Sequence, residues 1–239
     1  MNSNNASRAD NQQATSIYIE GASETTRETL FVEICKAYLQ GALHDGTFNK
    51  YNQRFRFCQK GTDWLKVLKR HLEYTGNHSW IYKEGKDRDV YILETKAKFL
   101  DIDCNPLALS TSEEKKAYIR GFFDAEGGIP KSSDSLFYIQ LVQNSHEKLL
   151  RIKVILYELG IITGVIHNPS RLKHPEYFRM FVLSGSRAKF LEQIGTNHPR
   201  KYATIKLRKE DDIVHALWRH RDYMNKASVA EAVDGSPPF

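Results

Sequence analysis

Two acidic residues, Asp45 and Glu126, each stand directly before a glycine at the end of an apolar stretch. The second stretch opens with Thr111 and Glu114, spaced as a capping box, which predicts a helix from Ser112 to Glu126. An acid at the C-terminal end of a helix is unfavourable, because the helix dipole is negative there. Two such carboxylates facing each other could be stabilised by a divalent cation, which prefers hard oxygen ligands. The two acids are therefore the candidate metal-binding and catalytic residues.

Both stretches also carry a glycine in the helix interior, Gly41 in the first and Gly121 in the second. Such a glycine costs about 1 kcal/mol relative to alanine, but it lets another backbone approach closely. The pattern predicts that the two helices pack against each other. The first stretch is one residue shorter between glycine and acid. If Gly41 keeps the register, Asp45 arrives about 100° early. If the acid keeps it, which we favour, Gln40 replaces the packing glycine and the first site is less regular.

Elements of the same kinds follow each acid in the same order. After Asp45 the patterns predict a hairpin, an amphipathic helix, a second hairpin and a short helix, at 48–51 with 54–59, 63–74, 79–83 with 88–94, and 96–100. After Glu126 they predict strands at 129–132 and 136–142, a helix at 145–159, strands at 163–167 and 177–183, and a helix at 187–194. Segments 96–100 and 187–191 are almost identical. The chain is therefore predicted to be a tandem duplication with pseudo-twofold symmetry.

The duplication predicts an α+β fold of two αββαββα repeats, with two antiparallel sheets. Thr25 and Glu28 form a second possible capping box at the start of the first helix. The predicted parts are a mobile polar segment at 1–24, a first repeat at 25–101, a linker at 102–111, a second repeat with a basic C-terminal helix at 112–226, and a frayed tail at 227–239.

Composition narrows the class of protein. The net charge of +6 and the pI of about 9.1 favour a polyanionic partner such as nucleic acid. Three widely spaced cysteines show no metal-binding spacing, so we expect reduced thiols and an intracellular protein. No apolar run is long enough to span a membrane, and the N-terminus lacks the pattern of a signal peptide. We therefore expect no membrane association.

The stretch from Ile119 to Gly127, Ile-Arg-Gly-Phe-Phe-Asp-Ala-Glu-Gly, resembles the motif of the LAGLIDADG homing endonucleases at every position. The order of elements resembles the single-chain, two-repeat form of that family from Glu28 to Leu207. The first motif, Leu39 to Gly46, departs from the pattern by its missing residue. The resemblance implies that the two helices form the interface between the repeats. Their acids would then meet at the floor of a saddle of β-strands that binds DNA.

The resemblance further implies a monomeric, Mg²⁺-dependent endonuclease. Such an enzyme cuts both strands of a long asymmetric DNA site and leaves short 3′ overhangs. Asp45 and Glu126 would bind the metal, with Mn²⁺ able to substitute and Ca²⁺ binding without efficient cleavage. Gln59 and Gln143 would position water, and Lys201 would polarise the phosphate. An intron-encoded protein, located with its host genome in a prokaryotic cytoplasm or an organelle, is expected.

In this family the residues one, three and five positions before each strand-end glutamine face the DNA. Here these are Arg54, Arg56 and Cys58 in the first repeat, and Tyr138, Gln140 and Val142 in the second. The same alternation leaves Phe55, Phe57, Ile139 and Leu141 for the core, in agreement with their hydrophobicity. Other expected DNA contacts are Asn49, Lys50, Lys83, Lys86, Arg88, Lys131, His167, Arg171, Lys173 and Arg200. Segment 177–183 alternates poorly, so Arg179 is assigned to neither face.

Three alternatives stay open. The chain could be an RNA maturase that helps its host intron to splice, because such relatives can retain both acids. It could be a DNA-binding regulator on the same scaffold that no longer cleaves, although the presence of both acids argues against this. Taken alone, each acid could also be a solvated residue at an ordinary helix end.

Overall fold

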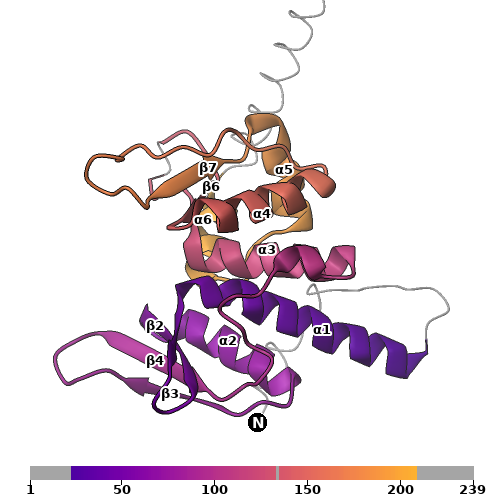
Figure 1. Ribbon diagram of the computed structural model, residues 1–239, viewed down its shortest axis with the longest axis vertical. Helices are drawn as coiled ribbons and strands as arrows, with labels where there is room; N and C mark the ends of the chain where they lie inside the picture. Colours follow the sequence, from indigo (N-terminus) through magenta and orange to yellow (C-terminus); the bar gives the residue numbers. More distant parts are fainter. Residues whose placement is uncertain (1–22, 133–134, 209–239) are drawn as a thin grey trace, which may run out of the picture.

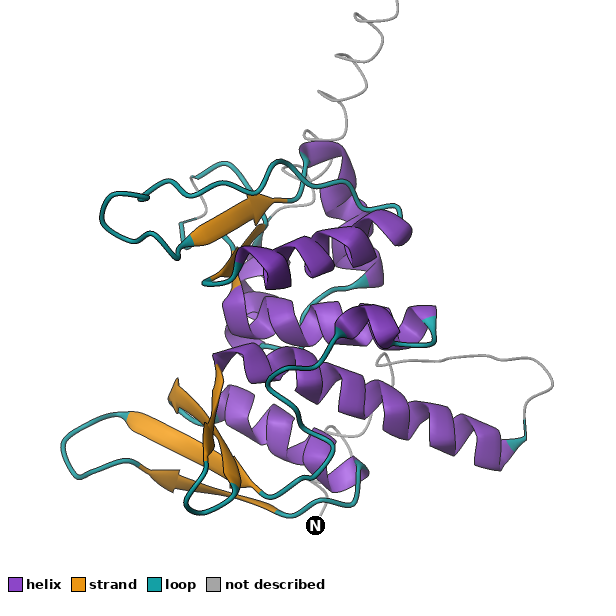
Figure 2. Cartoon of the chain, viewed as in Figure 1, coloured by secondary structure: helices purple, strands orange, loops and turns teal. Residues whose placement is uncertain are grey.

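The computed structural model describes residues 23–132 and 135–208 of the 239-residue chain. The predictions for 1–22 and 209–239 lie outside these residues; they concern the polar N-terminal segment, the later part of the basic helix and the frayed tail. Figure 1 shows two α/β halves stacked on each other, with helices α1 (Glu24–Ala42) and α3 (Ser112–Glu126) between them. Each half contains an antiparallel sheet, so the predicted α+β class is confirmed (Figure 2).

The two central helices begin with side-chain caps. The Thr111 N–H donates to Glu114 Oε2 at 2.7 Å, and the Glu114 N–H donates to Thr111 Oγ1 at 3.1 Å, which confirms the predicted capping box of α3. The cap of α1 is Ser23, whose Oγ accepts a hydrogen bond from the Thr26 N–H at 3.3 Å. Helix α1 therefore begins slightly before the predicted Thr25 box.

Helices α1 and α3 contact each other through their backbones at the two interior glycines. A Cβ atom added to Gly41 would lie 2.0 Å from the carbonyl oxygen of Tyr118. One added to Gly121 would lie 2.0 Å from the carbonyl oxygen of Tyr38. The contact is reciprocal, which confirms the predicted packing of the two helices. The register that we favoured, in which the acid keeps the alignment and Gln40 occupies the packing position, is therefore wrong. Gly41 occupies that position.

The first half follows from the end of α1. The chain passes through a 3₁₀ turn, η1 (Leu43–Asp45), into a sheet of order β1-β2-β4-β3. Its strands are β1 (Gly46–Asn49), β2 (Arg54–Lys60), β3 (Ser79–Lys83) and β4 (Val90–Thr95). Helix α2 (Asp63–Tyr74) covers one face of this sheet and buries four side chains there, Trp64, Leu65, Leu68 and Leu72.

The second half repeats this order with shorter strands, after the 3₁₀ turn η2 (Pro106–Ala108). Its sheet has the order β5-β6-β7, formed by β5 (Gly127–Gly128), β6 (Gln140–Gln143) and β7 (Phe178–Phe181). Its helices are α4 (His146–Glu158), α5 (Ser184–Gln193) and α6 (Pro199–Leu207). None of the helices within the described ranges is long and apolar enough to cross a membrane.

Two predicted strands of the second half are not formed as expected. The strand at 129–132 is absent, and pairing stops at Gly128, two residues before Pro130, which has no N–H to donate to a ladder. The strand at 163–167 is reduced to two isolated bridges, Thr163 with Val182 and His167 with Arg179. The sheet of the second half is therefore less regular than that of the first.

The helix predicted at 96–100 is also absent. The Ala97 N–H donates to Thr95 Oγ1 at 3.2 Å, and Gln40 Oε1 accepts a hydrogen bond from the Asp101 N–H at 3.0 Å. These side chains hold the segment in a non-helical path. The nearly identical segment 187–191 is helical because it lies inside the longer helix α5. Five residues alone are too few to form a stable helix.

Candidate active site and nucleic-acid face

Asp45 lies at the end of η1, where the chain enters the first sheet. Gln59, near the end of β2, donates a hydrogen bond from Nε2 to Asp45 Oδ2 at 2.7 Å. The carboxylate is open to solvent on one side and surrounded by protein on the other. This partial desolvation raises the pKa of Asp45, while the Gln59 hydrogen bond and the charge of Lys201 act in the opposite direction. Asp45 and Gln59, two sequence-predicted residues, are thus brought together.

Glu126 is the last residue of α3 and is half-buried. Burial raises the pKa of its carboxyl to about 7, and the negative charge of Asp45 contributes in the same direction. Lys201 opposes this shift. The two acids are therefore close enough to repel each other, as the sequence predicted for two helix ends that meet.

Lys201 lies on α6 and is only 7% exposed. Its Nζ donates hydrogen bonds to two carbonyl oxygens in the last turn of α3, that of Asp124 at 2.9 Å and that of Phe123. Burial lowers the pKa of Lys201 to about 8, whereas the acids Asp124, Glu126 and Asp45 favour its charged form. A cation at the C-terminal end of α3 complements the helix dipole, so Lys201 helps to hold Glu126 in place.

A buried carboxylate, Asp124, was not singled out from the sequence. It is 2% exposed and accepts hydrogen bonds from Tyr38 Oη at 2.8 Å, from the Asn197 N–H at 2.9 Å and from Thr196 Oγ1. Tyr38 in turn accepts a hydrogen bond from Trp64 Nε1 at 3.1 Å. Asp124 therefore ties α1, α3 and the segment before α6 together. The sequence signal that could have identified Asp124 is a second acid two residues before Glu126 in the same motif.

An equivalent network joins the end of the first motif to the second half, and it contains a neutral histidine, His44. His44 Nε2 lies 2.7 Å from Tyr118 Oη, and His44 Nδ1 lies 2.9 Å from Gln143 Nε2. Burial, with a smaller effect of Lys148, lowers the pKa of His44 to about 4, so the ring is neutral at pH 7. Gln143 Nε2 is then the donor to Nδ1, and His44 donates from Nε2 to Tyr118. Gln143 therefore contacts His44, whereas Gln59 contacts the acid of its own half.

The paired contacts locate the missing residue of the first motif. Equivalent residues of the two motifs are 80 positions apart, as shown by Tyr38 with Tyr118 (118 − 38), Gly41 with Gly121 (121 − 41) and His44 with Asp124 (124 − 44). The acids Asp45 and Glu126 are 81 positions apart (126 − 45). The missing residue is therefore the counterpart of Ala125.

The 3₁₀ turn η1 compensates for this deletion. Five α-helical steps from Gly121 to Glu126 advance about 7.5 Å along the axis. One α-helical step and three 3₁₀ steps from Gly41 to Asp45 also advance about 7.5 Å. The rotation about the axis then differs by about 40°, instead of about 100° for a continuous α-helix. The shorter motif thus brings its acid to the same depth as Glu126.

The acid pair is the candidate metal centre. Within residues 23–132 and 135–208, no group of three His, Cys, Asp or Glu side chains could hold a metal ion by itself. Asp45 and Glu126 offer two carboxylates whose pKa values are raised by burial, and for Glu126 also by the negative charge of Asp45. A divalent cation would relieve that repulsion, and its remaining ligands would come from phosphate or water. The residues therefore fit a hard cation that is shared with a phosphate-containing ligand.

The predicted outward and inward faces of β2 are confirmed. Phe57 is 1% exposed and packs in the core, while Cys58 is exposed on the opposite face. Arg56 pairs with Glu94 of β4, so the two side chains share the outward face, and Arg54 reaches the same carboxylate. The first sheet therefore presents arginines outward, but they are already bound to an acid.

The second sheet shows the same alternation and settles the position of Arg179. Ile139 and Leu141 are fully buried, whereas Gln140 and Val142 are partly exposed. Arg179 pairs with Val142 in the sheet, which places it on the outward face. It donates from Nε to His167 Nε2 at 3.1 Å. Arg179 is therefore an additional candidate contact for nucleic acid that sequence alternation had not assigned.

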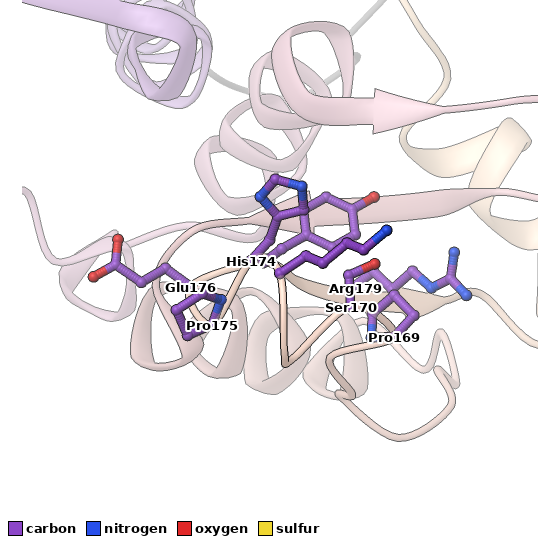
Figure 3. Close-up of a pocket in the computed structure, with 8 residues that line it drawn as sticks. Pro169, Ser170, His174, Pro175, Glu176 and Arg179 are labelled. Carbon is purple, nitrogen blue, oxygen red and sulfur yellow. The ribbon is translucent and has the colours of Figure 1, made fainter.

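The loop before β7 lines an open hollow of about 730 Å³. Figure 3 shows Arg179 and Ser170 at one end of this hollow, His174 in the middle and Glu176 at the other end. Lys173 also lines it. The remaining predicted contacts lie on strands, loops and α6, and all of them except Asn49 and Tyr138 are exposed: Asn49, Lys50, Lys83, Lys86, Arg88, Lys131, Tyr138, Arg171 and Arg200.

Parts of the chain are similar to known proteins. The family model of the LAGLIDADG-like domain matches residues 113–195, from α3 to the end of α5. The homing endonuclease I-ApeI from Aeropyrum pernix is 28% identical over 189 residues, which cover 69% of this chain and 82% of that protein.

Two solved structures have a similar fold. A mesophilic variant of the homing endonuclease I-DmoI has a TM-score of 0.55 at 20% identity, covering 73% of this chain and 98% of that one. The N-terminal LAGLIDADG domain of DUF199/WhiA has a TM-score of 0.55 at 15% identity, covering 77% of this chain and 87% of that one. Residues 113–195 therefore match the model of a LAGLIDADG-like domain, and the described part of the chain has the fold of these LAGLIDADG structures.

Proposed function

We propose that this protein is a site-specific homing endonuclease that cuts both strands of a double-stranded DNA site with the help of divalent cations. The observation that carries the proposal is the meeting of Asp45 and Glu126 at two helix ends, where each has a raised pKa. The relatives named homing endonucleases support it. Structures of I-DmoI with DNA and Mn, with target DNA in the presence of Mg, and with DNA and Ca support the metal.

The roles of the side chains follow from their contacts. Bound divalent cations, preferably Mg²⁺, would activate water and stabilise the leaving oxygen. Asp45 and Glu126 would hold these cations, and Gln59 would orient the Asp45 carboxylate through its hydrogen bond. Lys201 would keep the end of α3 in place and add positive charge beside the phosphate. Each acid would serve mainly one DNA strand, which gives the short 3′ overhangs expected from the resemblance.

The DNA would lie across the outward faces of the two sheets. The arginines of β2 and Arg179 of β7 are suited to guanine edges and phosphates in the major groove. The two faces carry different residues, so a monomer would read a long and asymmetric site. Affinity should fall steeply with salt concentration, because phosphate neutralisation releases counterions.

The test is cleavage of a plasmid that carries the intron-free allele of the host gene, with Mg²⁺ and with EDTA. We expect double-strand cleavage only with Mg²⁺. Glu126→Gln should abolish double-strand cleavage and keep DNA binding, and Asp45→Asn should do the same or leave only nicking. Glu158→Gln, which removes an exposed partner of Lys115, is the matched control and should cut normally. Full cutting by the Asp45→Asn, Glu126→Gln double variant would contradict the mechanism.

The alternatives can be separated in the same system. If the protein is an RNA maturase, the Asp45→Asn, Glu126→Gln double variant should still bind the host intron RNA and accelerate its splicing. A DNA-binding regulator would bind the duplex and leave it intact at every metal concentration. The coupled pair of carboxylates favours the nuclease, because a regulator has no need for two repelling acids at its interface.

A further inference from the structure

A second buried carboxylate lies on the outward face of the first sheet. Glu94 of β4 is 5% exposed. Arg54 Nη1 donates to its Oε2 at 2.9 Å, and Tyr82 Oη donates to its Oε1 at 2.9 Å. Arg56 Nε lies 3.2 Å from the same Oε1. One carboxylate therefore anchors two arginines and a tyrosine, on the face proposed to read DNA.

Glu94 is covered by these partners and is not part of the apolar core. The preceding residue, Leu93, packs in the core, and alternate residues of a strand point to opposite faces, so Glu94 points outward. It lies between Arg56 of β2 and Trp80 of β3, its direct neighbours across the sheet. Arg54 also lies over the Trp80 ring, with 4.7 Å from its Cζ to the ring centroid. The arginines themselves therefore exclude water from the carboxylate.

The arginines keep unused donors. The side chains of Arg54 and Arg56 are 33% and 32% exposed. A guanidinium group has five N–H donors, of which a guanine edge uses two. Each arginine can therefore stay bound to Glu94 and still present donors to a base.

We propose that Glu94 is a specificity-determining residue, which fixes the direction of Arg54 and Arg56 and partly neutralises them, so that they bind guanine edges and not the phosphates of any DNA. The inference rests on the proposed DNA-binding function. Mobile, unpaired arginines would bind every duplex through phosphates. Arginines held on a buried anion lose that general attraction and keep the geometry needed for bidentate base contacts.

The test compares Glu94→Gln with the control Glu84→Gln, which removes a more exposed acid 3.5 Å from Arg56. Binding of the full chain is measured with the target duplex and with a scrambled duplex, in Ca²⁺ to prevent cleavage and over a range of salt. Glu94→Gln should lower the ratio of the two affinities about tenfold. It should also steepen the salt dependence on scrambled DNA by about one phosphate contact. Glu84→Gln should keep the ratio within about twofold.

A purely structural role predicts different results. It would weaken binding to both duplexes equally, or lower the thermal stability without changing the ratio, and either result would overturn the inference. In the double variant Arg54→Gln, Arg56→Gln, adding Glu94→Gln should change the ratio no further. A further tenfold change there would also overturn it. Relaxed base preference should be confined to adjacent base pairs of one half-site.

Folding and function can be distinguished. If Glu94→Gln does not fold, Glu94→Asp keeps the charge with a shorter reach, and a partial loss of the ratio is expected; an unchanged ratio would contradict the proposal. A wild-type protein with no preference for its target would overturn the proposed function and this inference together. A wild-type preference that survives Glu94→Gln would overturn this inference alone.

Discussion

The two halves of the molecule position their acids, Asp45 and Glu126, through different contacts. In the first half, Gln59 binds Asp45 directly, and the motif reaches its acid through a 3₁₀ turn. In the second half, α3 is continuous to Glu126, but Gln143 binds His44 of the other half. From these contacts we expect that the deletion in the first motif does not mark the weaker site. The second acid is the one whose glutamine is engaged elsewhere, and this difference can be tested.

The largest expected effect is a loss of stability at the glycine contact between α1 and α3, which the two halves share. Gly41→Ala and Gly121→Ala should each destabilise the fold by about 3 kcal/mol, because a Cβ would lie 2.0 Å from a backbone oxygen of the other helix. Thermal unfolding measures this. Gly164→Ala, where an added Cβ would make only ordinary contacts, is the control and should change stability little. If one alanine variant were stable and the other not, the two sides of the helix contact would not be equivalent.

The two equivalent tyrosines should differ in importance. Tyr38→Phe removes a hydrogen bond to a buried carboxylate and leaves Trp64 Nε1 without its acceptor, so we expect a loss of about 2 kcal/mol. Tyr118→Phe removes the acceptor of the His44 Nε2–H, a neutral hydrogen bond with no charged partner, and we expect a loss of about 1 kcal/mol. Denaturant unfolding of both variants gives the comparison. Equal losses would show that the charge of Asp124 adds nothing.

The two glutamines should affect cleavage unequally. Gln59→Ala should slow cleavage of one DNA strand about tenfold, because Asp45 loses the donor that orients it, which corresponds to about 1.4 kcal/mol. Gln143→Ala should change cleavage of either strand by less than about twofold, since its side chain contacts His44. Strand-specific nicking of an end-labelled duplex measures both rates. Equal slowing by the two variants would mean that Gln143 turns towards Glu126 when DNA binds.

The smallest expected effect is a dependence of stability on pH. Burial and Asp45 raise the pKa of Glu126 from 4.5 to about 7, so the folded chain holds this proton more tightly than the unfolded chain. The resulting stability is present below about pH 4.5 and is lost as the pH rises through about 7. Because solvent screens this half-buried group, only part of the full linkage free energy should appear, so metal-free protein should lose roughly 3 °C in Tm between about pH 5 and pH 8, relative to Glu126→Gln. Saturating Mg²⁺ should remove this loss; an identical slope for the variant would contradict the coupling.

Local patterns predicted most of the elements of the first half correctly. The helix at 63–74 and the strand at 79–83 have the predicted bounds, because their apolar periodicity agrees with their packing. One prediction failed where residues outside the segment decide the structure, because segment 96–100 is held by Thr95 and Gln40. The strand at 129–132 failed for a local reason, since Pro130 lies inside the segment and has no N–H to donate to a ladder. Similar sequences thus formed different structures in the two halves.

The sequence by itself identified the two acids, the two interior glycines, the duplication and the alternation of the strands. Each of these depends on residue type and spacing, which are local properties. Only the tertiary structure decided that Gly41, and not Asp45, keeps the register of the first motif, because that requires knowing that the backbone of Tyr118 lies against Gly41. It also decided that Asp124, His44 and Glu94 are buried between elements far apart in the chain. Such contacts join residues that no periodicity links, so the partner of a buried polar group becomes known only when the chain is folded.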